Sequence, residues 1–327
     1  MFTMFADTLI YEDNGRIDMS KGIEYADEVI SSFLNLTKIK LSLAIIYIMD
    51  DNGEYEYTVR EMKNIIESHG VKVDCFNYDT DTKSDIIAKK IKECNKSYTG
   101  IYIINLKKST YDIRYFRNLI EKDKCIDGLH DGTIADILYF NYDNYRDYFL
   151  PIDVFLIKKI LENIDSDKKL NLSRNSKILL IDDFKEVNPS MKILGLELSH
   201  SALPYMYYQY STTNTSLMDY LKEADIIIAG ESIARHLKFD MIHNYDYITR
   251  DRVIIDLGTV RESCKTYGNL DLYSMKKGNI ILTENDQTPV RFVESQDMYN
   301  IRLFSDCIIN NLITAYHRQY EDNRGIL

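Results

Sequence analysis

The sequence predicts an α/β protein of two domains, an N-terminal parallel-sheet domain of catalytic type followed by a smaller Rossmann-like domain of nucleotide-binding type. Its 327 residues exceed the roughly 100 to 200 residues of a single domain. Short apolar runs alternate with amphipathic stretches, and this alternation occurs twice, on either side of a polar segment at residues 165–176. Such alternation indicates parallel strands joined by right-handed helical crossovers.

The first series contains the apolar run Leu41–Met49, which is typical of a buried parallel strand. Gly70 follows an amphipathic stretch at the position where a helix C-cap is expected. Pro151 is expected to introduce a further helix that extends to residue 164. We expect strands at 41–49, 71–78 and 100–106, and helices at 25–36, 57–68, 83–94 and 113–122.

The second series predicts the Rossmann-like domain. We expect strands at 177–181, 205–210, 225–229 and 253–257, and helices at 189–198 and 217–223. A last helix, expected at 301–320, has no partner strand of its own and is expected to pack on the first domain. The predicted division therefore places residues 1–165 with 301–327 in the first domain, and residues 166–300 in the second.

Composition and charge narrow the class of partner. The net charge of -11, without a basic stripe, argues against a nucleic-acid partner and favours a small ligand. The five cysteines are widely spaced and form no C-x-x-C pair, so neither a disulfide framework nor a metal site is predicted. No apolar run reaches the ~18 residues that span a membrane, and the start lacks the pattern of a secretory signal. We expect a cytoplasmic protein with no membrane partner.

Five local strings, LAIIYIMDDNGEY, CIDGLH, FLPID, EADIIIAG and VIIDLGTVR, stand along the chain in order and at a characteristic spacing. Over roughly residues 17–316 they resemble the methylenetetrahydrofolate dehydrogenase/cyclohydrolase (FolD) family. CIDGLH is similar to the family's DVDGFH, FLPID to its LPCTP, and VIIDLGTVR to its VVIDVGINR. LAIIYIMDDNGEY resembles the first strand and the loop that leads to the active-site tyrosine, and EADIIIAG resembles ADILVxAxG. The strings are found at 43–55, 125–130, 149–153, 223–230 and 253–261.

The resemblance implies oxidation of 5,10-methylenetetrahydrofolate with NAD or NADP as hydride acceptor, hydrolysis of the methenyl product, and a homodimer. Asp127 matches the family carboxylate that holds the pterin ring. A carboxylate suits this task because it accepts two parallel hydrogen bonds from an amino-pyrimidinone edge. The other interpretation is a turn-forming aspartate before Gly128. Tyr57 matches the active-site tyrosine whose ring stacks on the pterin, although it is one of 26 tyrosines and counting back from Gly70 selects Thr58 instead.

The resemblance also implies further ligand contacts. Asn105 stands where the family has a glutamine near its catalytic lysine, and Pro151 stands in the LPCTP-like string, so both are candidate substrate contacts. In the second domain, YSTT at 210–213 is similar to the family's HSxT. Ser211 and Thr213 of this string are candidate cofactor contacts. Gly258 and Thr259, which follow the expected strand at 253–257, are two more.

Three family features are replaced. The lysine that serves the cyclohydrolase step falls at Glu61, or at Met62 under the Thr58 alignment, and Lys63 lies about 240° around the helix from Tyr57 at about 100° per residue. The family's cofactor loop, GxSxxxGxP, is replaced by DDFKEVNPS at 182–190. The family's glycines let backbone N–H groups approach a phosphate, whereas the acidic residues of this string would repel it. The PGGVGP loop is replaced within residues 283–300.

Two functional classes stay open. The first is an enzyme of tetrahydrofolate one-carbon metabolism, a methylenetetrahydrofolate dehydrogenase-like oxidoreductase without efficient cyclohydrolase activity. The second is a non-catalytic FolD-like protein that binds folate or serves as an assembly partner. A third alternative, given less weight, is a diverged biosynthetic enzyme that uses the expected cleft between the two domains for a different reaction. Binding of tetrahydrofolate and of NAD or NADP distinguishes them.

Overall fold

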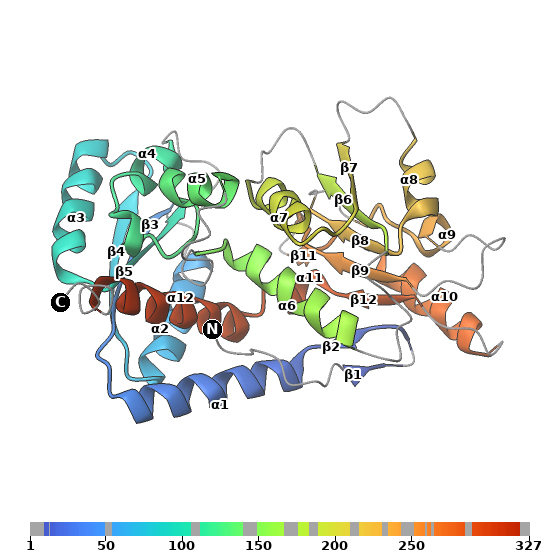
Figure 1. Cartoon of the computed structure of the whole chain (residues 1–327), viewed down its shortest axis with the longest axis horizontal. Helices are drawn as coiled ribbons and strands as arrows, with labels where there is room; N and C mark the ends of the chain where they lie inside the picture. The colour runs from blue at the N-terminus through green and yellow to red at the C-terminus, as the bar shows by residue number, and fades with distance from the viewer. Residues whose placement is uncertain are drawn as a thin grey trace. The chain divides into compact units, whose positions relative to one another are not determined.

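The computed structural model divides the chain into two compact units, which are described separately. Unit 1 contains residues 1–3, 26–152 and 301–327, and unit 2 contains residues 4–25 and 153–300. Helices and strands are labelled in Figure 1. The described residues are 10–12, 14–49, 54–105, 112–139, 149–166, 176–182, 189–209, 216–230, 235–242, 252–258, 260–262, 265–284 and 290–320.

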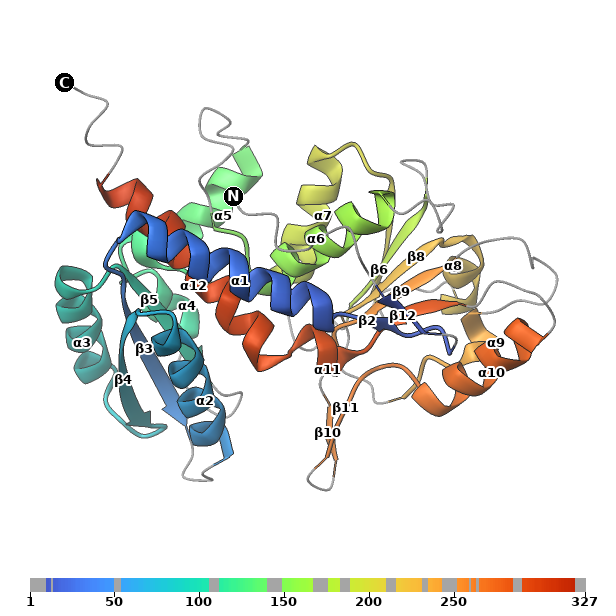
Figure 2. The same ribbon diagram turned by 90° about the horizontal axis from the view of Figure 1, so that it is seen from below.

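Unit 1 is built on a parallel three-stranded sheet with the order β4-β3-β5. Its strands are β3 (Ser42–Met49), β4 (Lys72–Asp79) and β5 (Gly100–Asn105). The central strand β3 is buried on both faces, which explains its unbroken apolar sequence. Residues Ala44, Ile46 and Ile48 pack against apolar residues of α3, on one face of the sheet. Figure 2 shows α2 and α3 on opposite sides of this sheet, as two right-handed crossovers require.

The helices of unit 1 follow the predicted pattern, with one helix shorter than expected. The expected helix at 113–122 ends early and is followed by a short 3-10 turn, and an additional helix begins directly after CIDGLH. The bounds are α1 (Ser20–Thr37, whose first turns belong to unit 2), α2 (Glu54–Ser68), α3 (Ser84–Ser97), α4 (Ile113–Arg117), η1 (Lys122–Lys124), α5 (Asp131–Tyr139) and α12 (Ile301–Tyr320).

The last helix, α12, belongs to unit 1, and this confirms the prediction that it returns to the first domain. It packs on α2 and on η1. The Asn311 amide donates to the carbonyl oxygen of Ile126 at 2.8 Å, and a Cβ on Gly100 would lie 2.5 Å from Leu312 Cδ1. The helix therefore closes the core of unit 1 beside the segment that carries CIDGLH.

Unit 2 contains a parallel five-stranded sheet with the order β12-β9-β8-β6-β7. Numbered in chain order, the strands are arranged 2-1-3-4-5. All are parallel, but successive strands are added on opposite sides of β6, so the topological switch point lies between β6 and β8. Ligands of such sheets bind outside the carboxyl ends of the strands at this switch point. The strands are β6 (Ile178–Asp182), β7 (Tyr205–Gln209), β8 (Ile226–Ala229), β9 (Val253–Asp256) and β12 (Arg291–Val293). The predicted fold class is confirmed.

Helices and two antiparallel hairpins complete unit 2. One sheet face packs on apolar residues of α8, α9 and α10. The helices are α6 (Ile152–Ser166), α7 (Pro189–His200), α8 (Leu217–Glu223), α9 (Phe239–Ile242), α10 (Leu272–Glu284) and α11 (Ser295–Met298). The hairpins are β1 (Ile10–Tyr11) with β2 (Ile17–Asp18), and β10 (Val260–Glu262) with β11 (Lys265–Tyr267). No helix among the described residues is long and apolar enough to cross a membrane.

The division into units differs from the sequence-based boundaries at two places. Most of α6 groups with unit 2, where Lys158 forms an ion pair with Glu197 at 2.5 Å. The β1–β2 hairpin also groups with unit 2, because Phe292 N donates to Gly15 O at 2.9 Å. The sequence analysis also missed α10 and β12, and β12 occupies part of the stretch assigned to a loop. A strand of three residues is too short to show a period-2 pattern.

One buried amide, Asn279, joins the hairpin to the sheet of unit 2. Its Nδ2 donates to Asn14 O and Val290 O, both at 2.9 Å, and its Oδ1 accepts from Val290 N at 2.8 Å. We predict that Asn279→Ala lowers the free energy of unfolding by about 2 to 4 kcal/mol, because buried backbone groups lose their partners. Denaturant unfolding measures this loss. Asn163→Ala, which removes a within-helix bond, is the control, and an equal loss in both variants would contradict the assignment.

Candidate functional site

The CIDGLH segment forms a tight turn around the Asp127 carboxylate. Asp127 is 6% exposed, and its Oδ1 accepts from Leu129 N at 2.9 Å and from the Cys125 thiol at 3.2 Å. Its Oδ2 accepts from Arg117 Nε at 2.5 Å. Burial raises the pKa of the Cys125 thiol, so this group stays protonated and remains a donor. The carboxylate is thereby fixed in direction, which a recognition group needs.

Gly128 brings two of the family-like strings together. Its φ is +75°, and a Cβ at this position would lie 2.5 Å from both Leu150 C and Pro151 N. Only glycine accommodates this approach without displacement of the backbone. CIDGLH and FLPID, with the candidate residues Asp127 and Pro151, are therefore neighbours in unit 1.

Arg117 is a site residue that the sequence analysis missed. It is the last residue of α4, and its side chain is 18% exposed beside the Asp127 carboxylate. The carboxyl group has about four lone-pair positions, and Arg117, Leu129 and Cys125 use three of them. A ligand amide or amino group therefore has room for one more hydrogen bond in this arrangement, and Arg117 must move for a second. No motif marks Arg117, because its contact with Asp127 depends on where η1 and the turn place the carboxylate.

The helix α2 carries the candidate Tyr57 on its exposed face. The Tyr57 ring is 57% exposed, and the Arg60 guanidinium lies 5.4 Å from its centroid. Glu61, one helical turn after Tyr57, is partly exposed, whereas Met62 is 4% exposed in the core. Lys63 lies 3.7 Å from Glu67 in an ion pair. Of the two alignments, the one that starts from Tyr57 places the family's lysine position at the surface.

Asn105 is the last residue of β5, and it pairs in register with Ile48 at the carboxyl edge of the sheet. The neighbouring strand β3 ends at the same edge, and α2 is the next element of the chain after it. The backbone of Asn105 and the segment that leads to α2 therefore lie at the same edge of the sheet. The His130 side chain caps the start of α5, where its Nδ1 accepts a hydrogen bond from Gly132 N at 2.9 Å. Burial lowers the pKa of His130, which favours the neutral ring.

In unit 2, a buried carboxylate occupies the first glycine position of the cofactor loop. Asp182 ends β6, at the switch point, and is 2% exposed. Its Oδ2 accepts from Tyr207 Oη at 2.5 Å, and burial with this bond raises the pKa of Tyr207. A glycine there allows a pyrophosphate to approach backbone N–H groups, whereas a carboxylate adds bulk and negative charge. The residues present do not fit a dinucleotide pyrophosphate bound in the family manner.

The end of β9 is organised by the Asp256 carboxylate. It is 1% exposed and accepts from the backbone N–H groups of Gly258 at 2.9 Å, Asn269 at 3.1 Å and Leu270 at 3.0 Å. A Cβ on Gly258 would lie 2.5 Å from the Asn269 side chain, which donates to Ala229 O at 3.1 Å. Gly258 is therefore required by packing. The other candidate cofactor contacts, Ser211, Thr213 and Thr259, lie outside the described residues.

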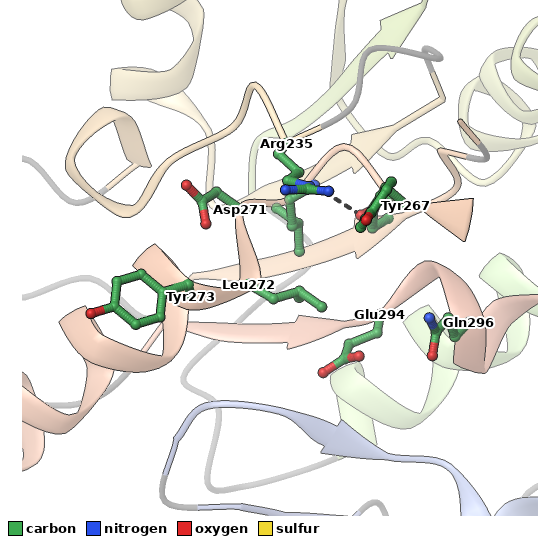
Figure 3. Close-up of a pocket in the computed structure, with 10 residues that line it drawn as sticks. Arg235, Tyr267, Asp271, Leu272, Tyr273, Glu294 and Gln296 are labelled. Atoms are coloured by element: carbon green, nitrogen blue, oxygen red, sulfur yellow. Dashed lines mark hydrogen bonds between the residues drawn. The ribbon is translucent and has the colours of Figure 1, made fainter. Parts of the chain in front are cut away.

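A cavity of about 440 Å³ lies in unit 2, beside residues that follow β9 and β12 (Figure 3). Its volume is within the range of small-molecule sites. The Arg235 guanidinium lies 3.6 Å from the centroid of the Tyr267 ring, and Glu294 forms an ion pair with Lys276 at 3.0 Å. The lining residues are Arg235, Asp256, Tyr267, Gly268, Leu270, Asp271, Leu272, Tyr273, Glu294 and Gln296. Among the polar ones, Asp256 lies in the VIIDLGTVR string, and the sequence analysis named none as a site residue, because they come from separate segments of the chain.

No protein-family model and no curated protein matches this sequence. Solved structures do match. The bifunctional 5,10-methylenetetrahydrofolate dehydrogenase/cyclohydrolase from Thermoplasma acidophilum is similar at 17% identity and a TM-score of 0.71, over 91% of this chain and 97% of that one. FolD from Campylobacter jejuni is similar at 18% identity and a TM-score of 0.71, over 90% and 96%. The chain has the FolD fold.

A further FolD structure extends the comparison. The Trypanosoma brucei enzyme, complexed with NADP cofactor and inhibitor, matches 95% of this chain and 98% of its own at 11% identity and a TM-score of 0.70. At such low identity the likeness shows the fold alone, because function depends on particular side chains. The family-like strings and their departures therefore carry the argument about activity.

The Gly128 contact gives a direct test of how the turn is built. We predict that Gly128→Ala lowers the free energy of unfolding by at least about 2 kcal/mol more than Gly70→Ala does. Both glycines have positive φ, but a Cβ on Gly70 meets no atom within 4 Å. Gly70→Ala therefore carries only the backbone strain of about 1 to 2 kcal/mol. Thermal and denaturant unfolding measure both values. Equal losses would show that Gly128 is not pressed against Leu150 and Pro151.

Proposed function

We propose that this protein binds a tetrahydrofolate one-carbon derivative through unit 1 and acts in tetrahydrofolate one-carbon metabolism. The observation that carries the proposal is the Asp127 carboxylate, which is buried and oriented by three donors, in a turn whose Gly128 lies against Leu150 and Pro151 within a FolD fold. Its spare lone pair is suited to the amino-pyrimidinone edge of a pterin. The exposed Tyr57 ring supplies a stacking surface for the same ligand, with Asn105 and Pro151 as the further contacts.

Two forms of this function are distinguished by the second unit. A non-catalytic folate-binding or assembly protein is favoured by Asp182, which replaces a glycine with a buried carboxylate at the switch point. A methylenetetrahydrofolate dehydrogenase-like oxidoreductase is favoured by the cavity of unit 2, which has room for a small ligand at the carboxyl ends of β9 and β12, although it does not lie at the switch point between β6 and β8. The oxidoreductase would use NAD or NADP as hydride acceptor. In either form we expect a homodimer.

Folate recognition is tested by Asp127→Asn, which keeps the shape of the side chain and removes its charge. We predict that the dissociation constant for tetrahydrofolate rises roughly 10- to 150-fold, the loss of about 1.5 to 3 kcal/mol expected for a charge-assisted hydrogen bond. Calorimetric titration of the whole chain measures it. Asp131→Asn, an exposed carboxylate paired with Arg114, is the control. Unchanged affinity in a folded Asp127→Asn protein would refute the proposed role.

The cyclohydrolase step is tested at the helix α2. We predict that wild-type protein hydrolyses methenyltetrahydrofolate at close to the uncatalysed rate, because a positioned acid or base contributes about 10²- to 10⁴-fold and Glu61 has the wrong charge for it. Glu61→Lys should raise the rate, as followed by loss of the methenyl absorbance. Met62→Lys should instead destabilise the fold, because its side chain is buried. Efficient hydrolysis by the wild type that Lys63→Ala abolishes would show that Lys63 has the catalytic role.

A further inference from the structure

Three titratable side chains from distant parts of the sequence meet inside unit 1. Asp27 comes from α1, His69 directly follows α2, and Asp306 comes from α12. His69 Nε2 lies 3.1 Å from Asp27 Oδ1 and 3.7 Å from Asp306 Oδ1. One nitrogen and two carboxylate oxygens therefore lie within 4.8 Å of one another, in an arrangement that is able to hold a metal ion.

Asp306 and His69, two of the three groups that face this point, are buried, whereas the Asp27 side chain is 26% exposed. Asp306 is 0% exposed, and neither of its carboxylate oxygens makes a hydrogen bond with any described residue. His69 Nε2 is also buried, and Asp27 Oδ1 lies outside hydrogen-bonding geometry to it despite the short distance. A buried carboxylate without hydrogen bonds or a cation is costly by several kcal/mol per ion, even after relaxation of the protein. The Asp306 carboxylate is therefore the group of this cluster that lacks a positive partner within hydrogen-bonding geometry.

Neighbouring side chains hold the cluster in direction. Ser31 Oγ lies 3.1 Å from His69 Nδ1, which leaves Nε2 turned toward the two carboxylates. Arg302 donates to Asp27 Oδ2 at 2.8 Å, which leaves Oδ1 on the side of His69. Hydrogen bonds to the far atoms of metal ligands are the usual means by which proteins orient such ligands.

We infer that Asp27, His69 and Asp306 form a structural site for a divalent first-row transition cation, with Zn²⁺ as the best match. Bonds of about 2.0 to 2.1 Å in a tetrahedral site place donor atoms about 3.3 Å apart, and the two measured separations lie on either side of this value. Bidentate binding by Asp306 would satisfy both of its oxygens and give four donor atoms. The imidazole favours zinc over Mg²⁺ and Ca²⁺, which prefer oxygen ligands alone.

Such an ion would join α1, the end of α2 and α12, and would therefore stabilise unit 1. The site is independent of the proposed folate ligand, because none of its residues belongs to the Asp127 turn. The sequence analysis predicted no metal site. Its ligands are separated too widely along the chain to form a recognisable spacing, and each of these residue types is common on its own.

Zinc binding to the untagged full-length chain tests the inference. After removal of metals with a chelator, Zn²⁺ should bind one equivalent in competition with a chromophoric chelator and should raise the unfolding temperature, whereas Mg²⁺ should not. Asp306→Asn and His69→Gln should abolish both effects, and Ser31→Ala should weaken binding by about 10- to 100-fold, as is typical for a group that orients a ligand.

His130→Gln, a partly buried histidine of the same unit outside the cluster, is the matched control and should bind zinc as the wild type does. Asp306→Asn preserves volume and removes a buried charge, so the variant is expected to fold, and circular dichroism checks this. The absence of a zinc-dependent rise in the wild-type unfolding temperature would overturn the inference. Equal zinc binding by the wild type and Asp306→Asn would also overturn it.

Discussion

The close approach of Gly128 to the Leu150–Pro151 backbone is the constraint on which the proposed folate site depends. It brings the turn that carries Asp127 against the FLPID segment, and it does so only because a positive φ and the absence of a Cβ are combined at one residue. Arg117 and the Leu129 amide then fix the carboxylate within that turn. The recognition group is therefore rigid before any ligand arrives, which lowers the entropic cost of binding.

The two units differ in how closely their polar residues resemble those of the FolD strings. In unit 1 the carboxylate, its turn and an exposed aromatic ring are present, whereas the lysine position holds Glu61. In unit 2 the parallel sheet and its switch point are present, but Asp182 is paired with Tyr207 at the start of the cofactor loop. The fold is maintained by apolar packing that many sequences satisfy, while activity depends on single polar side chains. A chain can therefore keep the fold while the polar side chains on which activity depends change.

The sequence predicted those elements whose pattern is long and strongly apolar. Strand β3 and helix α12 were located closely, because a buried parallel strand and a helix of 20 residues each leave a clear signal. Strand β12 was missed, because its three residues are too few. The partner of Asp127 was missed for another reason. Arg117 and Asp127 meet through tertiary packing, and no local spacing encodes that contact.

We propose that this chain binds tetrahydrofolate, and the decisive experiment is calorimetric titration of the wild-type protein with tetrahydrofolate and, separately, with NAD and NADP. We expect saturable binding of tetrahydrofolate at one site per chain, with NAD and NADP bound much more weakly or not at all. Binding of NAD or NADP without any binding of tetrahydrofolate would contradict it, because the Asp127 turn would then have no ligand and the Asp182 position would not hinder a dinucleotide.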